Sequence, residues 1–131
     1  MSNATNTVII TGASSGIGLG LAEAFLKAGY NVVGTGRSTE RLQAAAARLN
    51  AGERFLGVAG DVGKPESARQ VFAQAIAKFG KVDVLVNNAG IFTAKPFVQF
   101  TPDEVEEQIS TNLKGVLYPS QEAAKHMSER K

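Results

Sequence analysis

The 131-residue sequence contains no cysteine, no tryptophan and a single histidine, His126. Without cysteine the chain cannot form a disulfide, a thiolate nucleophile or a cysteine metal site, and this composition fits a reducing cytoplasm, where we expect the protein. One histidine excludes a cluster of histidine ligands, so we expect no metal site. We expect His126 itself to be a solvated residue near the end of a helix.

The net charge is also small, and long apolar runs are absent. The formal net charge is +2 and like charges do not gather in runs, which argues against nucleic acid or an acidic membrane surface as a partner. No apolar stretch approaches the roughly 20 residues of a membrane span, and no basic-then-apolar leader opens the chain. With 44% hydrophobic residues, the sequence is that of an ordinary globular domain, long enough for one core.

Glycine is concentrated in one informative stretch, residues 11–18, with the sequence TGASSGIG. An apolar run precedes it and an amphipathic segment from Ile17 to Ala28 follows, which predicts a strand, a turn and a helix. Glycine allows a tight turn and close approach to a ligand, and the start of a helix offers free N–H groups and a positive dipole to a pyrophosphate. Ser14 and Ser15 add hydroxyl donors. From the glycines alone, a turn without a ligand remains the alternative.

The rest of the chain alternates between short apolar runs and helical stripes. We expect strands at residues 7–11, 31–35, 55–58 and 82–86, and helices at 17–28, from the cap Ser38 to Gly52, at 65–79, and from Pro102 onward. In the last helix, which a capping box at Thr101 and Glu104 begins, we expect five inward side chains: Val105, Ile109, Leu113, Val116 and Ala123. This alternation predicts an α/β fold, a Rossmann-type doubly wound parallel sheet with strand order 3-2-1-4.

Two unusual loops meet in that topology. The glycine turn follows the first strand, and the loop NNAG at residues 87–90 follows the fourth. The switch point of the sheet lies between these two strands, and ligands of such folds bind there, at the carboxyl ends of the strands. We therefore expect one crevice lined by both loops.

The end of the second strand predicts the cofactor. In dinucleotide-binding folds an acidic residue there binds the 2′-hydroxyl of NAD and repels the 2′-phosphate of NADP. Here Gly36 stands in that position and Arg37 follows, with a planar fork of donors suited to a phosphate. A contact worth about 1.5–3 kcal/mol predicts a roughly tenfold to hundredfold preference for NADP over NAD. The alternatives are that Arg37 is a solvated loop cation and that Ser38 only caps the next helix.

The ordered motifs together resemble the short-chain dehydrogenase/reductase (SDR) family, from residue 7 to about residue 127. They are TGASSGIG at 11–18, Arg37, Asp61-Val62, NNAG at 87–90, and Asn112 within STNLKG at 110–115. The resemblance implies an oxidoreductase that transfers hydride between NAD(P)H and a small-molecule alcohol or carbonyl substrate. The predicted cofactor-binding residues are Gly12, Ser14, Ser15, Gly16, Ile17, Gly18, Arg37, Ser38, Asp61, Val62, Asn88, Ala89 and Gly90.

Three roles come from the resemblance alone. Asp61 and Val62 would lie against the adenine, although a turn aspartate that bonds its own backbone is the alternative. Asn88, Ala89 and Gly90 would contact the nicotinamide-side ribose. Asn112 would hold a water in the catalytic proton relay, or it is a mid-helix asparagine that bends or pins the helix. We give Asp83 no ligand role.

One departure from the family is decisive for activity. The family's chemistry needs a serine and a Tyr-x-x-x-Lys pair, in which the tyrosine donates a proton to the carbonyl. Residue 34, four after Tyr30, is glycine, and residue 122, four after Tyr118, is glutamate, so neither tyrosine fits. We interpret residues 1–131 as a single NAD(P)-binding Rossmann domain, truncated before that segment, incomplete at its C-terminal side and inactive alone.

Truncation would leave the fourth strand as a bare sheet edge and the last helix without a neighbour. Such surfaces favour association, so we expect a homo-oligomer or poor stability in isolation. The leading functional prediction is an NADP(H)-dependent SDR oxidoreductase, with NAD as the less favoured cofactor. The alternatives are a noncatalytic NADP(H)-binding or interaction module, and a structural Rossmann half with no ligand.

Overall fold

The computed structural model describes residues 5–91 and 94–130, and its strands form one parallel sheet of order β3-β2-β1-β4. The strands are β1 (Thr7–Ile10), β2 (Asn31–Gly36), β3 (Phe55–Ala59) and β4 (Val84–Val86). The helices are α1 (Gly16–Lys27), α2 (Thr39–Leu49), α3 (Pro65–Phe79), α4 (Pro102–Ile109) and α5 (Gly115–Glu129). The predicted fold class and strand order are confirmed.

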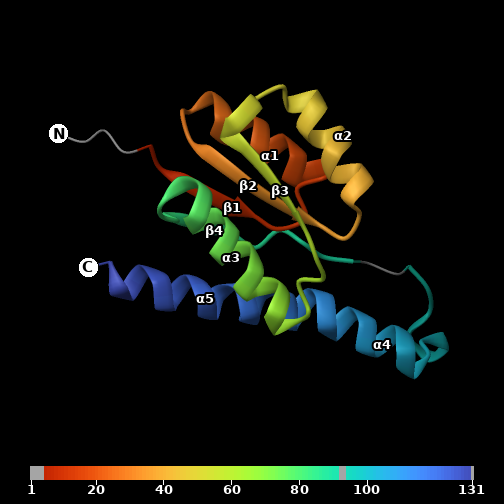
Figure 1. Ribbon diagram of the computed structural model, residues 1–131. Coiled ribbons are helices and arrows are strands. Elements are labelled where there is room, and N and C mark those ends of the chain that lie inside the picture. Colours follow the sequence, from red (N-terminus) through yellow and green to blue (C-terminus); the bar gives the residue numbers. More distant parts are fainter. Residues whose placement is uncertain (1–4, 92–93, 131) are drawn as a thin grey trace.

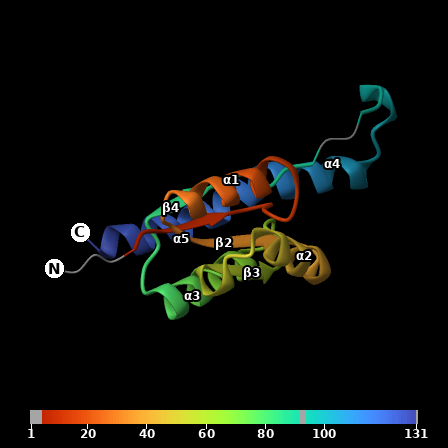
Figure 2. The ribbon, with the colours of Figure 1, turned by 90° about the horizontal axis from the view of Figure 1, so that it is seen from above.

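Helices cover both faces of the sheet, with α1 and α2 on one face and α3 and α5 on the other (Figures 1 and 2). The strand residues alternate accordingly: Val8 and Ile10 pack under α1, and Ile9 packs toward α3 and α5. All three side chains are fully buried. A strand buried on both faces reads as a continuous apolar run, and this is why β1 could be predicted from four residues.

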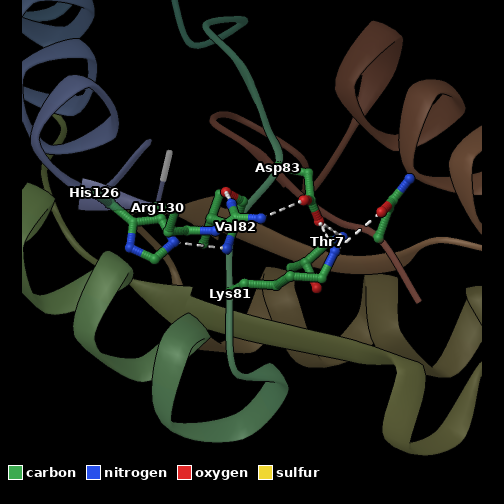
Figure 3. Close-up of polar contacts among 7 residues, drawn as sticks. Thr7, Lys81, Val82, Asp83, His126 and Arg130 are labelled. Carbon is green, nitrogen blue, oxygen red and sulfur yellow. Dashed lines mark hydrogen bonds and ion pairs between the residues drawn. The ribbon is translucent and has the colours of Figure 1, made fainter. Parts of the chain in front are cut away.

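Strand β4 begins at Val84, two residues later than predicted. Asp83 N still donates to the Thr7 carbonyl of β1 at 2.8 Å, whereas Val82 pairs with the end of α5. The Val82 N–H donates to His126 Nε2 at 3.0 Å, and the Val82 carbonyl accepts from Arg130 Nη1 at 2.7 Å (Figure 3). The backbone of Val82 is thus held by the end of α5. The prediction that His126 is merely solvated was wrong, since its ring is half-buried and accepts this hydrogen bond.

The predicted last helix is divided into α4, a π-helical turn at Ser110–Lys114 and α5. The capping box at its start is confirmed, with Thr101 and Glu104 each accepting from the backbone of the other. The inward stripe was largely wrong: Val105, Ile109 and Leu113 are exposed, and of the five only Ala123 is buried. Val105 and Ile109 precede the π turn, and α4 buries none of its residues, so this helix has no inward face for the stripe to occupy.

Small residues occupy the inward face instead: Gly115, Pro119 and Ala123 of α5 are buried. A Cβ on Gly115 would lie 2.7 Å from Val62 Cγ2, so this helix approaches the loop after β3 closely. That close approach brings the π turn over the carboxyl ends of the strands.

Candidate functional site

An open cavity of about 430 Å³ lies at the carboxyl ends of the strands, as predicted from the switch point. It receives residues from the turns after β1, β2, β3 and β4 and from the π turn. Its lining includes Gly12, Ser14, Ser15, Ile17, Arg37, Ser38, Val62, Asn88, Ala89 and Gly90 from the predicted set. Arg41, Ile91 and Thr111 also line it, and these three were not predicted.

The glycine turn is packed against the NNAG loop. Gly12 has φ +68°, and a Cβ there would lie 2.9 Å from Ala89 Cα. Gly18 stands behind the cavity rather than in its lining, and a Cβ there would collide with the Gly12 carbonyl and lie 2.6 Å from Asn88 Nδ2. These two positions exclude any larger residue because the helix and both loops meet there without space for a side chain.

The N-terminus of α1 faces this turn and is not capped by a side chain. Its first residue is Gly16, its N-cap is Ser15, whose side chain makes no capping hydrogen bond, and no acidic residue lies in its first turn. The N–H groups of such a turn and the helix dipole attract an anion. The arrangement therefore fits a pyrophosphate, and a carboxylate does not compete for the place.

Thr11, at the end of β1, locks the two loops together. Its buried Oγ1 accepts hydrogen bonds from Asn88 N at 2.9 Å and Ala89 N at 3.0 Å. Asn88 Nδ2 in turn donates to the Gly12 carbonyl at 3.0 Å. Sequence reasoning quoted Thr11 as part of the motif and missed this role; a hydroxyl directly after a buried apolar strand was the available signal.

Asn112 lies in the π turn and reaches the loop that follows β4. Ile91 N donates to Asn112 Oδ1 at 2.8 Å, and Asn112 Nδ2 donates to the Ile91 carbonyl at 2.9 Å. The structure thus shows a pinning role. A role for Asn112 in proton transfer stays a prediction.

Arg37 extends from the end of β2 across the cavity to the π turn. Its Nη2 donates to Thr111 Oγ1 at 2.8 Å and lies 4.0 Å from Asp61 Oδ1, and its Nη1 lies 4.0 Å from Glu107 Oε1. Arg37 is therefore engaged, not a freely solvated cation. Its neighbour Ser38 caps α2 by accepting from Arg41 N at 3.1 Å.

Asp61 lies beside the cavity. Its Oδ1 accepts from Gly63 N at 2.9 Å, which is the turn geometry that the alternative interpretation predicted. The same oxygen is the one near Arg37. Contact with an adenine stays a prediction for this residue.

Away from the cavity, Asp83 forms the centre of a polar cluster (Figure 3). It accepts from Lys81 Nζ at 2.7 Å, from Thr7 N at 2.8 Å and from Arg130 Nη2 at 3.1 Å. Burial raises the pKa of this carboxyl, but the hydrogen bonds from Lys81, Thr7 and Arg130 outweigh burial and hold the pKa below its ordinary value. This cluster ties β1, β4 and the end of α5 together.

Residues 6–131 match the family model described as short chain dehydrogenase. The chain belongs to this family. A serine 3-dehydrogenase of Rhizobium radiobacter is 38% identical over 97% of this chain and 51% of its own length. A farnesol dehydrogenase of Aedes aegypti is 41% identical over 97% of this chain and 53% of its own length.

Solved structures agree with the assignment to the short-chain dehydrogenases. A short chain dehydrogenase from Bacillus anthracis aligns with a TM-score of 0.92 and 35% identity, over 95% of this chain and 52% of that one. A 3-ketoacyl-(acyl-carrier-protein) reductase from Brucella melitensis, complexed with NADH, aligns with a TM-score of 0.90 and 34% identity, over 98% of this chain and 52% of that one.

This short-chain dehydrogenase chain spans about half the length of the curated relatives it matches. Across residues 5–91 and 94–130, no helix has the length and apolar character needed to cross a bilayer. The same residues contain no group of three or more histidine, aspartate or glutamate side chains placed to hold a metal ion.

Proposed function

We propose that this chain forms the cofactor-binding part of an NADP(H)-dependent oxidoreductase that acts on a small-molecule alcohol or carbonyl substrate. The observation that carries the proposal is one cavity with two anion-binding features, the uncapped N-terminus of α1 and the guanidinium of Arg37. Gly36, at the end of β2, places no carboxylate against a 2′-phosphate. Family membership supports the proposed reaction class, and the cavity supports the proposed cofactor preference.

The roles follow from position in the cavity. The first-turn N–H groups of α1, with Ser14 and Ser15, would hold the pyrophosphate. Arg37 would take the 2′-phosphate, and Arg41, in the first turn of α2, adds a second cation to that end of the cavity. Val62, with Asp61, would lie against the adenine.

The remaining loop would hold the reactive end of the cofactor. Asn88, Ala89 and Gly90 line the cavity beside the α1 turn and would contact the nicotinamide-side ribose. Asn112 would position this loop through Ile91 and hold a water for the proton relay. When bound, the nicotinamide supplies or accepts the hydride, and the residues of this chain bind and orient it.

Neither tyrosine lines the cavity. Tyr30 precedes β2 and packs edge-on against Phe25 at 4.9 Å between ring centroids, and Tyr118 lies in α5. We therefore propose that the proton donor lies outside these 131 residues, consistent with relatives about twice as long. We expect the chain alone to bind cofactor without turnover.

Cofactor preference needs a direct test, because the relatives differ. One is an L-rhamnose 1-dehydrogenase (NAD(P)(+)) of Sphingomonas sp., and a structural neighbour is complexed with NADH. Homo-oligomerisation and a cytoplasmic location stay parts of the proposal, the first from exposed apolar side chains on α4 and α5 and the second from the cysteine-free sequence.

The test is calorimetric titration of the chain with NADPH and NADH. We expect NADPH to bind at least tenfold more tightly, Arg37→Ala to abolish that difference, and Arg48→Ala, an exposed arginine of α2 outside the cavity lining, to preserve it. Equal affinities in the wild type would remove Arg37 as the selector. Binding of neither cofactor would overturn the proposal, and binding without turnover in the full-length protein would favour a noncatalytic module.

A further inference from the structure

The charge of Arg37 is shared between two carboxylates that belong to different elements. Asp61 follows β3 and Glu107 lies in the last turn of α4, and each carboxylate is 4.0 Å from a guanidinium nitrogen. Asp61 Oδ1 also accepts the turn hydrogen bond from Gly63 N. Within the described residues Glu107 forms no other ion pair, so Arg37 is its partner.

Thr111 fixes the guanidinium in this position. Its side chain is buried, and its Oγ1 accepts from Arg37 Nη2 at 2.8 Å. Thr111 and Glu107 lie four residues apart at the junction of α4 and the π turn, so both reach the guanidinium from the same side of the cavity. Thr111, in the π turn that follows α4, lines the cavity together with Arg37.

A phosphate bound to Arg37 would lie close to Glu107, because both anions would contact one guanidinium. The phosphate would have to displace Glu107 or stand beside a like charge, and either event weakens binding. A hydroxyl in place of the phosphate carries no charge and would not meet this opposition. Glu107 therefore affects the binding of the 2′-phosphate, which only NADPH carries. It does not affect the binding of the part that NADPH and NADH share.

Given the function proposed above, on which this step rests, we propose that Glu107 is a specificity-determining residue. By pairing with Arg37 it weakens the binding of the 2′-phosphate and limits the preference for NADPH over NADH. Both side chains are about half exposed, 52% for Arg37 and 57% for Glu107. Pairs of that exposure are worth about 0.2–1 kcal/mol. From the upper part of this range, about 0.4–1 kcal/mol, we expect removal of the Glu107 charge to tighten NADPH binding about twofold to fivefold.

The experiment measures the dissociation constants of NADPH and NADH for wild type, Glu107→Gln and the matched control Glu106→Gln. Glu106 lies on the same helix, is exposed, and pairs with Lys114 at 3.5 Å instead of Arg37. Both variants change the net charge equally. We expect Glu107→Gln to raise the ratio of the NADH to the NADPH dissociation constant about twofold to fivefold, and Glu106→Gln to leave this ratio as in wild type.

A double-mutant cycle assigns the effect to Arg37. In the Arg37→Ala background we expect Glu107→Gln to change the ratio by less than a factor of about 1.5, because the shared cation is absent. The inference is overturned if Glu107→Gln and Glu106→Gln shift the ratio equally, or if the Glu107→Gln shift persists without Arg37. If NADPH binds the wild type through Arg37 but Glu107→Gln has no effect, only this inference fails; if neither dinucleotide binds, the proposed function fails as well.

Discussion

Asn112 holds Ile91 with both ends of its side-chain amide, accepting from Ile91 N at 2.8 Å and donating to the Ile91 carbonyl at 2.9 Å. This pair of hydrogen bonds satisfies both backbone groups of a residue that lies outside any regular element. It joins the π turn between α4 and α5 to the loop that forms one wall of the cavity. The π turn and the loop after β4 are therefore held together by this side chain.

Asn112→Ala is expected to release that loop. Two hydrogen bonds of about 0.5–1.5 kcal/mol each are lost, so the Ile91 amide should exchange with solvent about fivefold or more faster. Hydrogen exchange followed by mass spectrometry or NMR measures this rate. The control is Asn87→Ala, which removes one hydrogen bond to Ser120 Oγ at 3.1 Å and leaves Ile91 held. Equal exchange at Ile91 in wild type and Asn112→Ala would contradict the pinning role.

Two threonines of the same strand region are expected to respond oppositely to one substitution. Thr11→Val removes the acceptor of Asn88 N and Ala89 N, and an unsatisfied buried donor costs about 1–3 kcal/mol. Thr7 Oγ1 is buried and has no hydrogen-bond partner among the described residues, so Thr7→Val should be neutral or stabilising. Urea unfolding gives both free energies, and equal losses in the two variants would refute this account.

The elements closest to the cavity were predictable because their signals are local. Apolar runs of four to six residues gave β1, β2 and β3 to within one residue, and the glycines of residues 11–18 gave the turn. A positive φ or a contact too close for a Cβ selects glycine directly, so the sequence records it. The capping box at Thr101 is local in the same way.

The surroundings of Arg37 could not be predicted because they depend on a π turn. Counting with a period of 3.6 from Val105 turned the apolar stripe inward, whereas the structure exposes it and directs Thr111 and Glu107 toward Arg37. A single wide turn changes the face of every later residue, and single sequences carry no clear signal for it. His126 was misjudged for a related reason, since its partner Val82 is 44 residues away in sequence.

We expect the free energy of unfolding to fall in acid because the Asp83 carboxylate becomes protonated. The pKa of this carboxyl is below its ordinary value in the folded chain, so its contribution is present above the unfolded value near pH 4 and is lost as pH falls through the lower, folded value. Asp83→Asn should cost about 1–3 kcal/mol at pH 7 and progressively less below about pH 4. Urea titrations between pH 2.5 and 7 test this. The control Asp103→Asn, at an exposed position of α4, should follow the wild-type dependence of stability on pH. A stability difference between Asp83→Asn and wild type that stays constant across the pH range would contradict this role of Asp83.

Association is expected to depend on the apolar side chains that α4, the π turn and α5 expose: Val105, Ile109, Leu113 and Leu117. Their four-residue spacing would drift around a regular α-helix, but the π turn brings Leu117 back toward the face of Val105. An apolar stripe of this length on the surface favours burial against another chain. Sedimentation velocity at micromolar concentration should show a species larger than the monomer, and Ile109→Lys with Leu113→Lys should shift it to the monomer. The control pair Ala44→Lys and Ala47→Lys adds the same charge to exposed positions of α2 and should leave the assembly intact. A monomeric wild type would show that this stripe does not hold chains together. Equal dissociation by both pairs of substitutions would show the same.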